Sequence, residues 1–168
     1  MITTLILLPL LILIPFANPL SFNFTTFTPN DPNIIYTSSA TTANNAIQLT
    51  MNQKDIIGRA TYAHPLHLWD KSSGNLTDFS TNFTFVINSL HSKFYGDGLA
   101  FFIEPNGSSI PNNASGRGMG LSSDKNGTLN STNDNPFVAV EFDIFSNGWD
   151  PPGQHVGIDI SSMISVAT

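Results

Sequence analysis

Five side chains with metal-binding chemistry lie within 15 residues: Glu141, Asp143, Asn147, Asp150 and His155. Side chains two apart on a β-strand point the same way, so Glu141 and Asp143 share one face. These carboxylates repel each other, and no lysine or arginine follows Lys125 to offset them. Hard oxygen ligands suit Ca²⁺, and carboxylates with an imidazole suit Mn²⁺ or a similar transition ion. We therefore predict a site for one or two metal ions, the simpler alternative being a solvated acidic surface.

Two strands and the loop between them must position these side chains. Over residues 137–144 apolar side chains alternate with Glu141 and Asp143, and alternation resumes over 156–160. The loop is stiffened by two prolines, which restrict the backbone. If the two strands pair as a hairpin, His155 at the head of the second strand faces the two carboxylates. The apolar residues of the opposite face are Val138, Val140, Phe142 and Ile144.

Other segments carry the same period-two pattern. Alternation predicts strands over 21–25 and 82–87, and residues 99–103 are apolar on both faces, which is typical of a central strand. Turn signals separate these segments, and no segment after residue 20 has a helical stripe. Many short strands in 168 residues indicate one all-β sandwich or barrel. The polar stretch 112–135 is long for a loop in a compact domain, and such loops are usually functional or mobile.

The composition excludes several classes of partner and chemistry. The formal charge of −6 argues against nucleic acid or an anionic membrane, because either calls for a basic face. Asn, Ser and Thr supply 52 residues and phenylalanine 13, which suits an antiparallel β-protein better than a helical bundle. Cysteine is absent, so disulfides, zinc–thiolate sites and thiol nucleophiles are excluded.

The N-terminal segment predicts a secretory route. Residues 1–20 carry no charged side chain, and their apolar run from Leu5 to Ile14 is shorter than the roughly 20 residues that a membrane span needs. A signal peptide over residues 1–20 fits this pattern. We expect a secreted, extracellular protein, membrane-attached only if this segment is uncleaved or a further C-terminal segment spans. Seven sequons are glycosylation candidates: Asn23, Asn75, Asn82, Asn106, Asn113, Asn126 and Asn130.

Several ordered motifs together resemble the legume lectin family. The segment from Val138 to Asn147, then Trp149-Asp-Pro and His155-Val-Gly-Ile-Asp-Ile, carries the closest resemblance. The resemblance as a whole runs from about residue 21 to the end. It implies a concanavalin-like jelly-roll sandwich over residues 21–168, C-terminally incomplete, that binds sugars through a Ca²⁺/Mn²⁺ pair. Further motifs that fit are Ser21-Phe-Asn-Phe, Gly58-Arg-Ala-Thr-Tyr, His67-Leu-Trp, Phe79-Ser-Thr-Asn-Phe-Thr-Phe and Gly96-Asp-Gly-Leu-Ala-Phe-Phe.

The resemblance assigns each metal ligand a role. The transition-metal ligands are implied to be Glu141, Asp143, Asp150 and His155. The Ca²⁺ ligands are implied to be Asp143, Asn147, Asp150 and the backbone carbonyl of Phe145.

The resemblance also implies a sugar site. Asp97, after a cis Gly96–Asp97 peptide, would accept hydrogen bonds from two sugar hydroxyls. The Asn147 amide would reach both calcium and sugar, and the Phe145 ring would lie under the apolar sugar face. Calcium would orient Asp97 and Asn147 without touching the sugar.

Two features depart from the family pattern. Where the family has a Gly-Gly-aromatic-Leu-Gly loop that donates a backbone N–H to the sugar, this chain has Gly116-Arg-Gly-Met-Gly120, with Arg117 at the donor position. Its N–H remains, but its side chain would crowd or extend the site. The chain also stops at Thr168, short of a family domain, so later strands and the last sugar-contacting loop are expected to be missing. The expected partners are glycans or glycoproteins, and a homodimer through the back sheet is expected only if the domain is completed.

Two alternatives to a non-catalytic lectin domain stay open. One is a signalling or structural ectodomain fragment without working sugar binding, which the Arg117 departure and the missing C-terminal part favour. The other is a glycoside hydrolase of the same sandwich fold, since Glu141-x-Asp143 matches the start of a Glu-x-Asp-x-Glu strand. Hydrolysis needs two working carboxylates flanking the bond. The third position here is Phe145, so the acid/base partner is missing and we predict no enzymatic activity.

Overall fold

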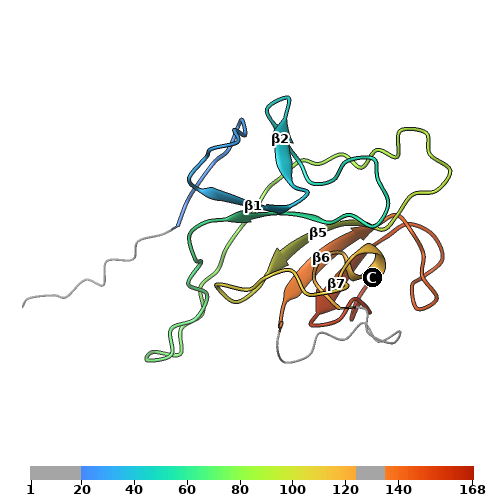
Figure 1. Ribbon diagram of the computed structural model, residues 1–168. Helices are drawn as coiled ribbons and strands as arrows, with labels where there is room; N and C mark the ends of the chain where they lie inside the picture. The colour runs from blue at the N-terminus through green and yellow to red at the C-terminus, as the bar shows by residue number, and fades with distance from the viewer. Residues whose placement is uncertain (1–19, 124–134) are drawn as a thin grey trace, which may run out of the picture.

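The computed structural model describes residues 20–123 and 135–168 (Figure 1). The expected signal peptide, apart from its last residue, and the sequons at Asn126 and Asn130 lie outside these ranges. The described part is all-β, with one short 3₁₀ turn, η1 (Gly116–Gly118), in the polar loop. No helix in the described ranges is long and apolar enough to cross a membrane. The strands are β1 (Ile34–Ser38), β2 (Thr41–Ala43), β3 (Ala46–Gln48), β4 (Gly58–Tyr62), β5 (Gly98–Ile103), β6 (Val138–Asp143) and β7 (His155–Ile160).

The site-bearing sheet has the order β5-β6-β7, and both pairs are antiparallel. The predicted hairpin is confirmed, because Asp143 on β6 pairs with His155 on β7. The expectation that residues 99–103 form a central strand is wrong for the described residues. Here β6 is central and β5 lies at the edge, paired with β6 alone.

Two smaller antiparallel pairs complete the described sheets. β1 pairs with β4, and β2 pairs with β3 through a two-residue turn. Both turn residues, Asn44 and Asn45, have positive φ, 52° and 62°. Asparagine tolerates this conformation, and such turns match the twist of hairpin strands. β4 is tied to the end of β5 by an ion pair between Arg59 and Glu104, which are largely buried.

Two predicted strands are absent from the structure. Residues 21–25 and 82–87 join no sheet, although aromatic rings of both segments pack against residues of the strands. Phe22 stacks on Tyr62 with the ring centroids 4.0 Å apart, and Phe85 lies 4.6 Å from Phe142. Side-chain packing thus holds these segments near β4 and β6, whereas a strand would also require a backbone hydrogen-bond ladder.

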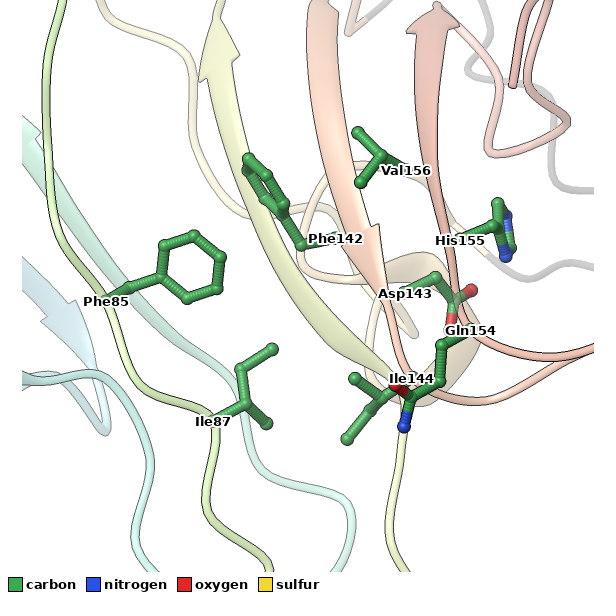
Figure 2. Close-up of a pocket in the computed structure, with 8 residues that line it drawn as sticks. All are labelled: Phe85, Ile87, Phe142, Asp143, Ile144, Gln154, His155 and Val156. Carbon is green, nitrogen blue, oxygen red and sulfur yellow. The ribbon is translucent and has the colours of Figure 1, made fainter.

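The two faces of β6 differ in burial, and the charged face is the covered one. Ala139, Glu141 and Asp143 are buried, whereas Val138 on the other face is 49% exposed. The buried apolar cluster lies on the same side and consists of Leu121, Phe137, Ala139 and Met163, with Met119 and Trp149 packed against it. The apolar side opens into a pocket of about 410 Å³, part of whose lining is Phe85, Ile87, Phe142, Ile144 and Val156 (Figure 2).

Candidate functional site

Strand register brings the predicted metal ligands together. Glu141 and Asp143 point to the same side of β6, and His155 begins the neighbouring strand opposite Asp143. His155 Nε2 lies 3.2 Å from Glu141 Oε1. One ligand atom from each of these three side chains falls within 4.8 Å of the other two. Glu141 is only 2% exposed and Asp143 4%, so the cluster is not the solvated acidic surface of the simpler interpretation.

The loop between β6 and β7 adds the remaining predicted ligands. Its first turn is closed by the Phe145 N–H, which donates to Asp143 Oδ1 at 2.6 Å. Farther along, the Asn147 N–H donates to Asp150 Oδ2 at 2.6 Å, and the Asp150 N–H donates back to the Asn147 carbonyl at 3.2 Å. Asp150 Oδ1 lies 3.9 Å from His155 Nε2. Backbone hydrogen bonds thus tie Phe145 to Asp143 and Asn147 to Asp150, and Asp150 lies near His155.

Burial makes the negative charge of this cluster costly. Desolvation is the largest cause that raises the pKa of Asp143, the charges of Asp150 and Glu141 add to it, and the Phe145 N–H and His155 oppose it. The net result is a pKa of about 6. Buried carboxylates are usually paired or bound to metal. Carboxylate oxygens and an imidazole nitrogen converging within one small volume are the donor set that suits a divalent cation.

Sequence reasoning missed two residues of the cluster, Asp159 and Ser165. Asp159 is 0% exposed, and desolvation is the largest cause that raises its pKa to about 7, with Glu141 also contributing. Ser165 Oγ lies 2.6 Å from Glu141 Oε1 and 2.8 Å from Asp159 Oδ1. The period-two pattern that starts at His155 could have predicted Asp159, because residues 155, 157 and 159 point to the same side of β7. Ser165 follows β7, is placed by the bridge between Ile158 and Ala167, and leaves no signal in the sequence.

Asp97 lies next to this cluster, at the start of β5. The Gly96–Asp97 peptide is cis, as predicted. The Ile144 N–H donates to the Asp97 carbonyl at 2.8 Å, which joins this turn to the end of β6. Burial raises the pKa of the Asp97 carboxyl, Arg117 opposes that shift and Asp150 adds to it.

Two other predicted sugar-site residues, Phe145 and Arg117, lie near Asp97. A Cβ placed on Gly96 would lie 3.0 Å from Phe145 Cβ, so the half-exposed Phe145 ring lies beside the cis turn. A Cβ placed on Gly116 would lie 3.4 Å from Asp97 Oδ2, which brings the η1 loop to the carboxylate. The Arg117 guanidinium carbon lies 5.3 Å from the centroid of the Trp149 ring. The Arg117 side chain is thus directed to the loop between β6 and β7, residues 144–154, which we call the metal-site loop.

The glycosylation candidates in the described ranges are all exposed, as a glycan would require. They are Asn23, Asn75, Asn82, Asn106 and Asn113.

Comparisons with known proteins give one answer. The family described as Legume lectin domain matches residues 19–168. Lectin 9 of Medicago truncatula is 42% identical over 90% of this chain, and Agglutinin-2 of Cladrastis kentukea is 41% identical over 90%. The Lotus tetragonolobus seed lectin matches 88% of the chain with a TM-score of 0.70 and 28% identity. Lectin UEA-II complexed with galactose matches 89% with a TM-score of 0.67 and 34% identity.

The chain is shorter than these relatives. It spans 58% of the length of Lectin 9, 54% of Agglutinin-2, 64% of the Lotus seed lectin chain and 65% of the UEA-II chain. These matches confirm the predicted fold and the resemblance to the family. The relatives are lectins, which agrees with the prediction of a non-catalytic domain. This chain belongs to the legume lectin family.

Proposed function

We propose that this chain binds carbohydrate non-catalytically, at a site organised by Ca²⁺ and Mn²⁺. The observation that carries the proposal is the burial of Glu141 and Asp143 against His155, beside Asp97. Bound cations would offset the buried negative charge and fix the loop that follows β6. Family membership and sugar-bound structural relatives support the carbohydrate half of the proposal.

The donor atoms divide between two ions. Glu141, Asp143, Asp150 and His155 would hold the transition ion, and Asp143, Asn147, Asp150 and the Phe145 carbonyl would hold Ca²⁺. Asp143 and Asp150 would belong to both ligand sets, and each carboxylate has two oxygens to offer. The ions would supply fixed positive charge that keeps these carboxylates ionised and in place.

The protein groups around Asp97 would make the sugar contacts. The Asp97 carboxylate accepts hydrogen bonds from sugar hydroxyls, and the Asn147 amide and the Arg117 backbone N–H donate to sugar oxygens. The exposed Phe145 ring covers an apolar C–H face of the sugar.

The structural relatives suggest the first sugars to try. One is the basic winged bean lectin with Tn-antigen, another is UEA-II with galactose, and a third is the Bauhinia forficata lectin with GalNAc. Galactose and N-acetylgalactosamine are therefore the first probes, with mannose as a comparison.

Calorimetric titration of the whole chain with these sugars, after loading with Ca²⁺ and Mn²⁺, tests the proposal. Saturable binding that disappears in EDTA is expected. If the chain binds metal but binds neither these sugars nor any glycan on an array, the alternative of a signalling or structural ectodomain is favoured. Release of a cut product from any glycan would instead favour the hydrolase alternative.

The secretory route also remains a proposal. The exposed sequon asparagines support it, and loss of mass on treatment of the plant-expressed protein with an endoglycosidase would test it. A single unglycosylated species retained inside the cell would contradict it.

A further inference from the structure

The loop that carries Arg117 is anchored firmly at its far end. The Gly120 N–H donates to the Ala114 carbonyl at 2.8 Å, and the Gly120 carbonyl accepts from Arg59 Nη2 at 2.7 Å. Arg59 is 5% exposed and also pairs with Glu104, so this anchor joins the loop to β4 and to the end of β5. The far half of the loop is thus fixed from inside the protein, without help from the metal-site loop.

The near half of the loop, residues 115–117, lies beside Asp97 and Trp149. Ser115 at the start of η1 makes no side-chain capping hydrogen bond, and Gly116, which lies next to Asp97, is exposed. The guanidinium of Arg117 reaches across to the ring of Trp149, at 5.3 Å from its centroid. Trp149 packs against the buried apolar cluster and directly precedes Asp150. A cation over an indole face is an attractive contact, and it strengthens when the pair is partly desolvated.

We propose that Arg117 is a positioning residue whose contact with Trp149 couples the loop beside Asp97 to the loop that holds Asp150. Through this contact, order in one loop favours order in the other. Binding of Ca²⁺ and Mn²⁺ at Asp150 therefore also steadies the Arg117 backbone N–H that faces the sugar position. The second step rests on the proposed function, whereas the contact and its effect on the loop do not.

Hydrogen exchange of the whole chain tests the contact directly. Arg117→Gln keeps a long polar side chain but removes the cation, and Lys71→Gln, an exposed site in another loop, is the control with the same charge change. In Arg117→Gln the amides of residues 115–117 should exchange about two- to fivefold faster, as expected for loss of one cation–π contact, whereas the anchored Gly120 amide should not change. Arg117→Lys should restore part of the protection, and Lys71→Gln should leave it unchanged. Equal protection in wild type and Arg117→Gln, with and without metal, would overturn the proposal.

The coupling to metal needs a second readout that a general loss of stability would not produce. Adding Ca²⁺ and Mn²⁺ should slow exchange over residues 115–117 in wild type, and this slowing should be lost in Arg117→Gln and in Trp149→Leu. Because such coupling is reciprocal, calorimetry with the metals alone should show metal affinity falling by about two- to fivefold in Arg117→Gln, and galactose affinity should fall by a similar factor. Loop slowing that is as large in Arg117→Gln as in wild type would contradict the coupling. Absence of metal binding in wild type would instead refute the proposed function, and the metal-free exchange comparison would still decide the Arg117 contact.

Discussion

Asp143 lies directly opposite His155 across the β6–β7 ladder, and its partner on the other side of β6 is Gly98, the residue after Asp97. One strand position therefore joins the candidate metal ligands to the candidate sugar-binding turn. Asp143 also closes the first turn of the metal-site loop through the Phe145 N–H. Under the proposed function, a metal held at Asp143 would therefore influence the sugar-binding turn without touching the sugar.

Replacing Asp143 should remove both functions. Asp143→Ala takes away a carboxylate that both ions would share and the acceptor of the Phe145 N–H. We expect loss of Mn²⁺ and Ca²⁺ binding and of galactose binding in calorimetric titrations. Asp78→Ala, at an exposed carboxylate outside the cluster, is the control and should bind normally. Full sugar binding by Asp143→Ala would refute a metal-organised site.

Replacing Asp97 should separate the two functions. Asp97→Ala removes the acceptor of the sugar hydroxyls but leaves the cluster around Glu141 and His155 in place. Sugar binding should fall at least about 100-fold, because hydrogen bonds to a charged group contribute about 1.5–3 kcal/mol each and two are lost. Metal affinity, measured on the same sample, should stay within about twofold of wild type, a margin set well below one such hydrogen bond. Sugar binding that survives this substitution would remove Asp97 from the site.

The glycine opposite Glu141 should be intolerant of a side chain. A Cβ on Gly157 would lie 2.0 Å from Ser165 Oγ and 2.6 Å from Glu141 Oε1, which no ordinary contact allows. Gly157→Ala should lower stability by about 1–3 kcal/mol in urea unfolding, the usual cost of overpacking. It should also weaken metal binding, because Glu141 must move.

Gly148→Ala is the matched control for Gly157→Ala. A Cβ there meets nothing within 4 Å, and Gly148 is not among the glycines with positive φ. Its unfolding free energy and metal affinity should therefore remain near those of wild type. Equal stability of the two variants would mean that β7 does not lie against Ser165 as described.

Stability and metal binding should respond to pH in opposite directions. Burial raises the pKa of Asp143 to about 6 and that of Asp159 to about 7, so between pH 4 and 7 the folded metal-free chain binds more protons than the unfolded chain. Linkage then requires the free energy of unfolding of the metal-free chain to rise as pH falls from 7.5 to about 5. Protons compete with metal for Asp143, so the stabilisation by Ca²⁺ and Mn²⁺ should shrink over the same interval. Thermal melts at several pH values, with metal and with EDTA, measure both trends, and parallel trends would contradict the assignment.

Much of the site was predictable because it is local. The β6–loop–β7 unit alternates cleanly, and antiparallel pairing of its two strands brings His155 opposite Asp143. Alternation, however, shows which residues share a face and not which face is covered. The carboxylate face proved to be the buried one, because Ser165 lies against Glu141 and Leu121 packs with Ala139. Both contacts join residues that are distant in sequence.

The features that the sequence did not predict also depend on contacts between residues distant in sequence. Residues 82–87 alternate as a strand does, yet a strand exists only where a partner backbone completes the ladder. Ser165 enters the cluster through the bridge of Ile158 to Ala167, a tertiary contact with no periodic signature. The direction of the Arg117 side chain depends on Trp149, which lies on a different loop.

Thermal unfolding of the whole chain, in EDTA and then with Ca²⁺ and Mn²⁺ added, tests the central claim most directly. A ligand that binds the folded state alone raises the midpoint, by about 5–10 °C at a hundredfold excess over its Kd for a chain of this size. We predict a cooperative transition whose midpoint rises by that amount with metal and returns on chelation. A midpoint that is the same in EDTA and in excess metal, or the absence of any cooperative transition, would contradict a metal-organised lectin site in this chain.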